Sequence, residues 1–272
     1  MLELYYLEEA DSICSNRVRM TLMEKGIEDW TAHKLILMDG DQFTPKYLAL
    51  NPKAQVPTLV HNGLVIRESS IISSYIDDLT PAPALKPSDP AGRASLQEWI
   101  KESDEYGYQA TASINFVTKF RLAVPLNKLE SRWKQVTDIE RVHRQQSCVR
   151  EGYASPYVLR AVGHWDRIFR KMEEALTDGG PWIMGDQFTL AETLNAPFVK
   201  VLEMLRLLPL WLDDRPNVQA WWNRITDRNS YNQLEEYPGQ SEDDTAPHAV
   251  AGRAGAADMA RVLRQYRDIM PS

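Results

Sequence analysis

Four prolines between Pro81 and Pro90 place the first constraint on this chain of 272 residues. Proline fixes φ and lacks an amide N–H, so a cluster this dense ends regular structure and marks a linker. Strand and helix patterns alternate before the cluster, whereas only helical patterns follow it. The sequence therefore predicts two domains, residues 1–80 and 91–272, joined by a linker at 81–90.

The first eighty residues combine the signals of a mixed α/β domain. The dipeptide Asn62-Gly63 joins two short apolar runs, which is a strong hairpin signal. The segment Ser69–Asp78 carries apolar residues at helical spacing, and Gly26 is a typical helix stop. The expected order is βαβ, a short helix, then ββα: strands at Leu2–Leu7, Thr31–Leu37, Thr58–His61 and Leu64–Arg67, with helices at 12–25, Pro45–Leu50 and Ser69–Asp78.

The second half reads as helices. The segment Thr189-Leu-Ala-Glu192 is a capping box, in which the threonine caps the helix and the glutamate reaches back. The segment Tyr237–Ala254 is rich in Gly, Ala, Pro and acidic residues, so we expect a loose linker there, before a last short helix at 256–269. The other expected helices are 91–120, 138–150, 156–176, 190–207 and 218–227.

Charge and composition exclude several classes of function. The formal net charge of −7 argues against nucleic acid as a partner, because phosphate binding needs a basic face. The N-terminus has no secretory pattern and no apolar run is long enough to span a membrane, so we expect a cytoplasmic protein that binds no membrane. The two cysteines imply no disulfide framework, and the histidines show no metal-ligand spacing, so we expect no metal.

Three motifs resemble those of cytosolic glutathione transferases. Asn51–Leu59 (Asn-Pro-Lys-Ala-Gln-Val-Pro-Thr-Leu) is similar to the loop before their third strand, and Glu68–Asp77 to the start of their third helix. Gly185–Glu192 is similar to the cap motif of their helical domain, whose last residue is usually Asp. The resemblance implies a thioredoxin-like, glutathione-binding α/β domain with a mixed four-stranded sheet, followed by an all-α helical bundle that shapes the substrate site and ends in a C-terminal tail. It also implies a homodimer.

Within this family, two stretches of the helical half resemble the glutathione-dependent β-etherases of lignin-degrading bacteria. They are Glu98–Tyr106 and Arg150–Tyr153. This likeness implies that the electrophile is a small aromatic molecule, a β-aryl ether among the candidates.

Each part of glutathione needs a different partner. A residue before a cis-proline can offer its N–H and C=O to the cysteinyl backbone as an edge strand does, and Val56 before Pro57 is the candidate; the alternative is an ordinary trans proline. A helix N-terminus with Ser69 suits the γ-glutamyl carboxylate, and Glu68 suits the ammonium, although both also fit a simple helix cap. Gln55 is a weaker candidate for the glycine end or its neighbouring backbone, and Lys53 is a still weaker candidate that would add positive charge.

The reaction needs a thiolate, which a hydroxyl donor and a helix N-terminus both stabilise. Ser12, Cys14 and Ser15 lie where the first helix is expected to begin. Aligned through the end of that helix, Ser15 matches the serine of the β-etherases and Cys14 the cysteine of the bacterial beta class. The string Cys14–Arg19 also resembles the zeta class (maleylacetoacetate isomerases), where Ser12 matches the catalytic serine, but Ile13 departs from that pattern. We take Ser15 as the first candidate for the residue that stabilises the thiolate and Ser12 as the second.

Cys14 has two interpretations. A helix N-terminus lowers a thiol pKa, which would allow a mixed disulfide with glutathione, as in omega-type thiol transferases. The alternative is a small residue that packs beneath the helix. Cys148 is interpreted as structural.

The second substrate is expected on the first long helices of the helical domain, although every residue there also fits an ordinary core. Aromatic rings suit a flat substrate. The candidates are Tyr106, Tyr108, Asn115, Phe116, Lys119 and Phe120.

The leading hypothesis is an enzyme that joins the glutathione thiolate to an electrophilic carbon in detoxification or ether cleavage. A zeta-like isomerase or a Cys14 thiol transferase is the second hypothesis. The third is a catalytically silent member of the fold that binds proteins.

Overall fold

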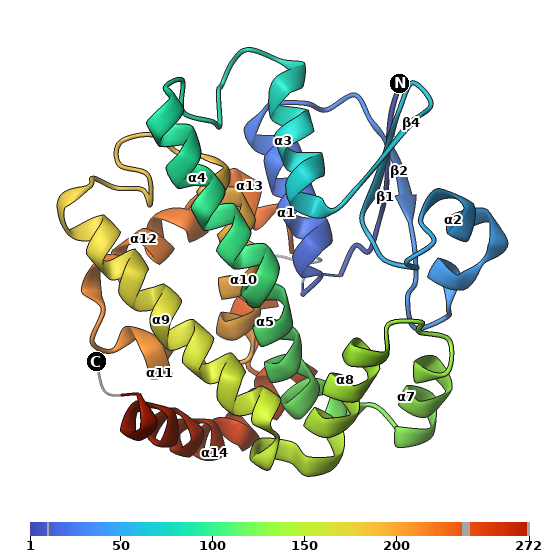
Figure 1. Ribbon diagram of the computed structural model, residues 1–272, viewed down its shortest axis with the longest axis vertical. Coiled ribbons are helices and arrows are strands. Elements are labelled where there is room, and N and C mark those ends of the chain that lie inside the picture. Colours follow the sequence, from blue (N-terminus) through green and yellow to red (C-terminus); the bar gives the residue numbers. More distant parts are fainter. Residues whose placement is uncertain (10, 236–239, 271–272) are drawn as a thin grey trace. The chain divides into compact units, whose positions relative to one another are not determined.

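The computed structural model describes residues 1–9, 11–235 and 240–270 (Figure 1). The chain forms two compact units, of which the first comprises Met1–Lys101, Gly179–Pro197 and Trp222–Pro238. The second comprises Glu102–Asp178, Phe198–Trp221 and Gly239–Ser272. The boundaries expected from the sequence, with a linker at 81–90, stay a prediction. Within the described residues, no helix has the length and apolar character needed to cross a membrane.

The first unit contains a mixed sheet of four strands in the order β2-β1-β3-β4, which confirms the expected βαβ–ββα fold. Strands β1 and β2 are parallel, whereas β3 is antiparallel to both β1 and β4. Asn62 and Gly63, both at positive φ, form the turn between β3 and β4. The elements are β1 (Leu2–Tyr6), α1 (Ile13–Glu24), β2 (Thr31–Lys34), η1 (Asp41–Phe43), α2 (Pro45–Leu50), β3 (Thr58–His61), β4 (Leu64–Arg67) and α3 (Ser69–Leu79).

Side chains alternate between the two faces of β1 and fix where the helices pack. Helices α1 and α3 cover one face of the sheet, and α2 lies on the other side (Figure 1). On the α2 side, the Tyr5 ring stacks on His33 at 4.2 Å between centroids and lies 6.1 Å from the ring of Tyr47. The core on the α1 and α3 side consists of Leu2, Leu4, Tyr6, Val18, Leu22, Leu59, Ile72 and Ile76.

A buried ion pair fastens the proline-rich segment to this core. Lys25 Nζ lies 2.9 Å from Asp77 Oδ1, and it also donates to the carbonyls of Thr80 at 2.8 Å and Pro83 at 2.5 Å. Asp77 accepts a further hydrogen bond from the Leu85 amide at 2.8 Å. Because both charges are buried and Lys25 Nζ donates to three acceptors, the pair fixes the path of the chain after α3.

The predicted capping box at Thr189 is confirmed. The Thr189 hydroxyl accepts from the Ala191 amide at 3.1 Å, and the Glu192 carboxylate accepts from the Thr189 amide at 2.8 Å. Glu192 also accepts from the Ile183 amide at 2.7 Å, which holds the preceding loop. Burial raises the pKa of Glu192 to about 7, although these hydrogen bonds act in the opposite direction.

The second unit is helical, as expected. The predicted long helix at 91–120 contains two π-helical turns, Ser103–Gly107 (η2) and Phe116–Phe120 (η3). Helix α7 was not expected from the sequence. The helices of the second half are α4 (Pro90–Glu102), α5 (Tyr108–Asn115), α6 (Arg121–Ala123), α7 (Leu126–Trp133), α8 (Ile139–Glu151), η4 (Gly152–Ala154), α9 (Pro156–Asp178), α10 (Leu190–Met204), α11 (Pro209–Leu212), α12 (Pro216–Thr226), α13 (Asn229–Asn232), η5 (Gln240–Glu242) and α14 (Pro247–Ile269).

The expected loose linker at 237–254 is wrong from Pro247 onward, where α14 begins. Pro247 occupies the first turn of the helix, where a missing N–H costs nothing. The small residues permit close packing: a Cβ atom on Gly252 would lie 1.7 Å from the Leu205 carbonyl oxygen, and one on Gly255 1.7 Å from the Tyr153 hydroxyl. Residues 237–239, also in that expected linker, lie outside the described residues.

Asp166 in α9 joins three segments of the second unit. Arg267 of α14 and Arg215 both contact Asp166 Oδ1, at 2.7 and 3.1 Å, and Arg170 contacts Oδ2 at 3.3 Å. Burial raises the pKa of Asp166, but Arg267 and Arg215 lower it by more, and the net effect is a lowered pKa.

Candidate functional site

The start of α1 carries the three residues predicted to activate the thiol. Ser15 is fully buried, and its hydroxyl accepts a hydrogen bond from the Leu7 amide at 3.1 Å. Ser12 is the N-cap residue of α1, and its side chain makes no capping hydrogen bond. Cys14 is half-buried and, within the described residues, belongs to no disulfide. The structure thus brings the three together, and Ser12 and Cys14 are more accessible than Ser15.

The loop before β3 contains a cis Val56–Pro57 peptide bond, as expected from the sequence. Two side chains hold the carbonyl of Gln55: the Tyr47 hydroxyl donates to it at 2.5 Å and Asn51 Nδ2 at 2.8 Å. Burial raises the pKa of Tyr47 to about 12, so this hydroxyl keeps its proton and remains a donor. The loop is therefore fixed before any ligand arrives.

Tyr47 and Asn51 were missed as supporting residues by sequence reasoning. Asn51 opens the motif that was recognised, so its position was a usable signal. Nothing in the pattern of α2 distinguished Tyr47 from an ordinary core residue.

The N-terminus of α3 carries Glu68 and Ser69. Glu68 has a positive φ of 67°, and its carboxylate lies 2.6 Å from Lys53 Nζ. The Ser69 hydroxyl accepts from Arg17 Nη1 at 2.8 Å, and both side chains are buried. These contacts connect α1, the loop of Val56 and α3, so the predicted glutathione residues form one cluster in the first unit. Arg17 was missed, although the string Cys14–Arg19 contains it.

The six predicted substrate residues all lie in the second unit, where the structure gathers only some of them. The rings of Phe116 and Phe120 stack with centroids 4.4 Å apart, and Lys119 Nζ lies 5.8 Å from the Phe120 centroid. Tyr106 instead lies against His164, with ring centroids 5.7 Å apart. Asn115 is buried and Tyr108 half-buried. Their role in substrate binding stays a prediction.

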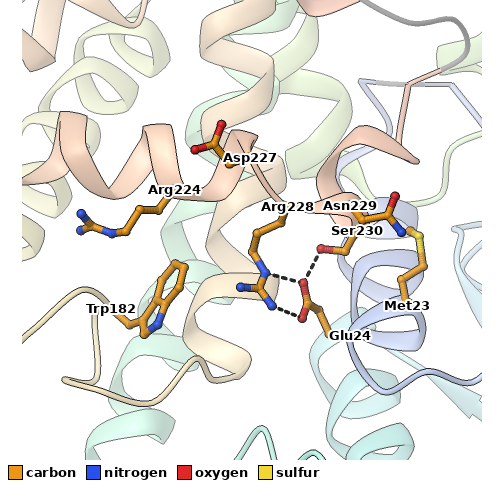
Figure 2. A pocket seen from close by; sticks show the side chains of 8 residues that line it. All are labelled: Met23, Glu24, Trp182, Arg224, Asp227, Arg228, Asn229 and Ser230. Atoms are coloured by element: carbon orange, nitrogen blue, oxygen red, sulfur yellow. Dashed lines mark hydrogen bonds and ion pairs between the residues drawn. The ribbon is translucent and has the colours of Figure 1, made fainter.

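A pocket that sequence reasoning did not foresee lies in the first unit and is shown in Figure 2. We call it the Glu24 pocket; its volume is about 510 Å³. Glu24 accepts two hydrogen bonds from Arg228, at 2.7 and 2.6 Å, and a third from the Ser230 hydroxyl. Its lining residues are Met23, Glu24, Trp182, Arg224, Asp227, Arg228, Asn229 and Ser230.

Aromatic rings complete the surroundings of the Glu24 pocket. The Arg228 guanidinium lies 4.0 Å from the Phe188 centroid and 5.4 Å from that of Trp182. Arg224 donates to the Pro181 carbonyl at 3.0 Å. Because Glu24 and Arg228 neutralise each other, we interpret this pocket as a structural junction between α1 and the segment after α12.

Comparisons with known proteins agree with this geometry. Residues 11–79 match the N-terminal domain of glutathione S-transferases, and residues 142–229 match their C-terminal domain. Maleylacetoacetate isomerase of Pseudomonas aeruginosa is 30% identical over 68% of this chain and 75% of that protein.

Solved structures show the same fold. The β-etherase LigF of Sphingobium sp. strain SYK-6 superimposes with a TM-score of 0.71, at 24% identity over 86% of this chain and 98% of that one. A glutathione transferase of Burkholderia graminis, solved with two glutathione molecules per subunit, has a TM-score of 0.64, at 24% identity over 86% of this chain and 88% of that one. From the matched domains and the similarity to the isomerase, the chain belongs to the glutathione S-transferase family.

Proposed function

We propose that this glutathione S-transferase binds glutathione in the cluster formed by α1, the Val56 loop and α3, and transfers its sulfur to an aromatic electrophile. The observation that carries the proposal is the Arg17–Ser69 hydrogen bond of 2.8 Å at the N-terminus of α3. It brings a hydroxyl and a buried positive charge next to the backbone amides of a helix start, a combination that suits a carboxylate.

The other glutathione groups fit the remaining residues of this cluster. Val56 offers its N–H and C=O to the cysteinyl backbone, next to a loop that Tyr47 and Asn51 already hold. Glu68 takes the γ-glutamyl ammonium, in exchange for part of its contact with Lys53. Lys53 and Gln55 then face the glycine end. Support comes from the Burkholderia graminis structure, whose glutathione molecules were seen directly.

The chemical step follows from the start of α1. The thiol of glutathione loses its proton to solvent, and the α1 dipole together with a hydroxyl or thiol donor stabilises the resulting thiolate. The thiolate forms a carbon–sulfur bond with the electrophile, and the leaving group, a halide or an aryl oxide, departs with the bonding electron pair. Ser15, Ser12 and Cys14 are the candidates for the donor, and the stacked pair Phe116–Phe120 is the candidate surface for an aromatic ring.

A second candidate function is a glutathione-dependent isomerase. The similarity to the Pseudomonas aeruginosa maleylacetoacetate isomerase favours it. There the thiolate would add to a carbon–carbon double bond and leave again after rotation, so glutathione would not be consumed. The expected homodimer, the cytoplasmic location and the role in detoxification stay predictions.

Calorimetric titration with glutathione tests the binding site through a matched pair of serines. Ser69 and Ser70 are neighbours in the first turn of α3 and are each 6% exposed. We expect Ser69→Ala to weaken binding by about tenfold, because a hydrogen bond to a charged group is lost, and Ser70→Ala to weaken it little. Equal glutathione affinities of the two variants would show that Ser69 does not bind the carboxylate. An absence of glutathione binding in the unmodified protein would overturn the proposal.

Activity assays separate the reactions and the thiol-activating residues. The substrates are an aryl nitro-halide, a β-aryl ether dimer, a cis-enone acid and a glutathione mixed disulfide, each tested with Ser12→Ala, Cys14→Ala and Ser15→Ala. Ether or halide displacement that is lost in a serine variant and kept in Cys14→Ala supports the transferase. Isomerisation of the cis-enone without consumption of glutathione supports the second candidate. Disulfide exchange lost only in Cys14→Ala would assign a thiol transferase instead.

A further inference from the structure

The second unit contains a pocket of about 210 Å³ that is lined by residues of α5, α8 and α9 and by one residue of η2. We call it the Arg144 pocket. Helix α9 contributes Tyr157, Arg160, His164 and Arg167, which share one helix face at spacings of three and four residues. Helix α8 contributes Arg144, and η2 contributes Tyr106, which comes just before α5. Helices α5 and α9 lie side by side in Figure 1.

The positive charge in the Arg144 pocket is not balanced by a carboxylate among the residues that the structure describes. Three of the lining residues are arginines, and none of the described lining residues is an aspartate or a glutamate. Within the described part of the chain, no carboxylate pairs with Arg144, Arg160 or Arg167. Arginine keeps its charge in proteins, so it cannot escape the cost of burial by losing a proton.

Two residues of this pocket have buried polar atoms without a hydrogen-bond partner among the described residues. Arg144 is 5% exposed, and its Nε atom has no partner among the described residues. His164 is 3% exposed, and neither ring nitrogen has a partner there. Buried polar atoms in folded proteins are nearly always hydrogen-bonded, so such a pair of exceptions calls for a missing partner. Both residues line the same pocket.

We propose that the Arg144 pocket binds a small molecule that carries an oxyanion, either a carboxylate or a phosphate group. A guanidinium presents its N–H groups in a fork that matches both groups in a bidentate manner. His164 can donate one further hydrogen bond from its ring. The rings of Tyr106 and Tyr157 border the pocket and suit a flat carbon skeleton.

The size of the pocket limits the ligand. Its volume of about 210 Å³ lies below the roughly 300–1,000 Å³ of pockets that hold drug-sized ligands, so we expect a smaller molecule. Its described lining residues include none of the predicted glutathione residues, so the existence of this site does not depend on the proposed function.

The experiment uses benzoate and inorganic phosphate as probes and benzamide as the neutral counterpart of benzoate. Binding is measured by calorimetry on the full chain. The altered protein is the double variant Arg160→Gln/Arg167→Gln, whose two side chains are exposed and can change without disturbing the core. The control is Arg264→Gln, an exposed arginine of α14 that does not line the pocket.

We expect at least one anionic probe to bind the unmodified protein and the Arg264→Gln variant, and benzamide to bind neither. The double variant should bind that probe at least about tenfold more weakly, because charge-assisted hydrogen bonds are lost. Binding of benzoate alone assigns a carboxylate, and binding of phosphate alone assigns a phosphate group. Failure of both probes to bind, or equal binding by the double variant, would overturn the proposal.

Two parallel measurements separate an anion site from a glutathione site and from a contact between copies of the chain. Glutathione affinity should be the same in the double variant, so a failure here remains separate from a failure of the proposed function. Molar mass by light scattering should also be unchanged. A change in oligomeric state in the double variant, without binding of either anion, would assign the arginines to a contact between copies and refute the ligand site.

Discussion

Arginine lines both the Glu24 pocket and the Arg144 pocket, but its surroundings differ. In the Glu24 pocket, Arg228 gives two hydrogen bonds to one carboxylate and lies against two aromatic rings. Among the described residues, the lining of the Arg144 pocket contains three arginines and no carboxylate. The charges of Glu24 and Arg228 are therefore paired within the chain, whereas the arginines of the Arg144 pocket can pair with a bound anion. The difference shows that charge pairing, more than pocket volume, separates a structural junction from a candidate binding site.

The largest effect that follows from this comparison is the pH dependence of stability through His164. Burial, together with the charges of Arg167 and Arg160, lowers the pKa of His164 from 6.5 to about 3. Between these pH values the unfolded chain binds the proton and the folded chain does not. Stability is therefore lost as the pH falls, by up to about 5 kcal/mol over the whole interval and about 2 kcal/mol by pH 5.

Urea unfolding of the ligand-free protein at several pH values measures this loss. His164→Phe should flatten the profile between about pH 7 and pH 5. His143→Gln, at an exposed histidine of α8, is the control substitution. Parallel profiles for the unmodified protein and His164→Phe would show that His164 titrates normally, and would remove one of the two unsatisfied groups from the argument for an anion.

The next prediction concerns the Glu24 pocket, where Arg228 is paired with a carboxylate. Glu24→Gln removes the negative charge that holds Arg228 and Ser230. Because the Glu24 side chain is only 9% exposed, the change leaves a poorly compensated arginine, and we expect the free energy of unfolding to fall by about 2–4 kcal/mol.

Glu130→Gln provides the control for Glu24→Gln. Glu130 pairs with Arg150 at 3.2 Å on an exposed surface, where such a pair contributes little. Chemical denaturation of both variants gives the measurement. A loss for Glu24→Gln as small as that of Glu130→Gln would contradict the structural interpretation of the Glu24 pocket.

Much of the first unit could be predicted from the sequence, because its signals are local. The turn at Asn62-Gly63 and the capping box at Thr189 depend on residues a few positions apart. Recognition of the glutathione cluster likewise depended on short motifs. Arg17 escaped notice because its partner Ser69 lies 52 positions away, and no local pattern marks such a contact.

The second unit was harder to predict, since its features depend on packing between distant segments. Gly252 lies in the segment that was expected to be a loose linker and Gly255 directly follows that segment, but the structure uses both glycines where α14 approaches Leu205 and Tyr153. The Arg144 pocket needs three helices at once, and no local pattern in the sequence marks its arginines. Tyr106 was selected for its aromatic ring and its place on the first long helices of the second half, and the structure places it beside His164.

The smallest expected effect comes from a comparison of two arginines of the second unit, Arg144 and Arg215. Arg144→Met replaces a buried charge, which pairs with no carboxylate of the described residues, with an apolar chain of similar length. The free energy of unfolding of the ligand-free protein should therefore rise by about 1 kcal/mol. Arg215→Met is the matched change at an arginine that is paired, 3.1 Å from the buried Asp166. There we expect a loss of about 2–3 kcal/mol, because part of the compensation for that carboxylate disappears.

Whether Arg144→Met raises or lowers the free energy of unfolding decides between two interpretations of Arg144. A rise in stability that coincides with lost anion binding would show that Arg144 is retained at a cost to the fold, as expected of a ligand-binding residue. A loss as large as that of Arg215→Met would mean that the folded chain already compensates Arg144, and the two pockets would then differ only in the kind of partner that satisfies their arginines.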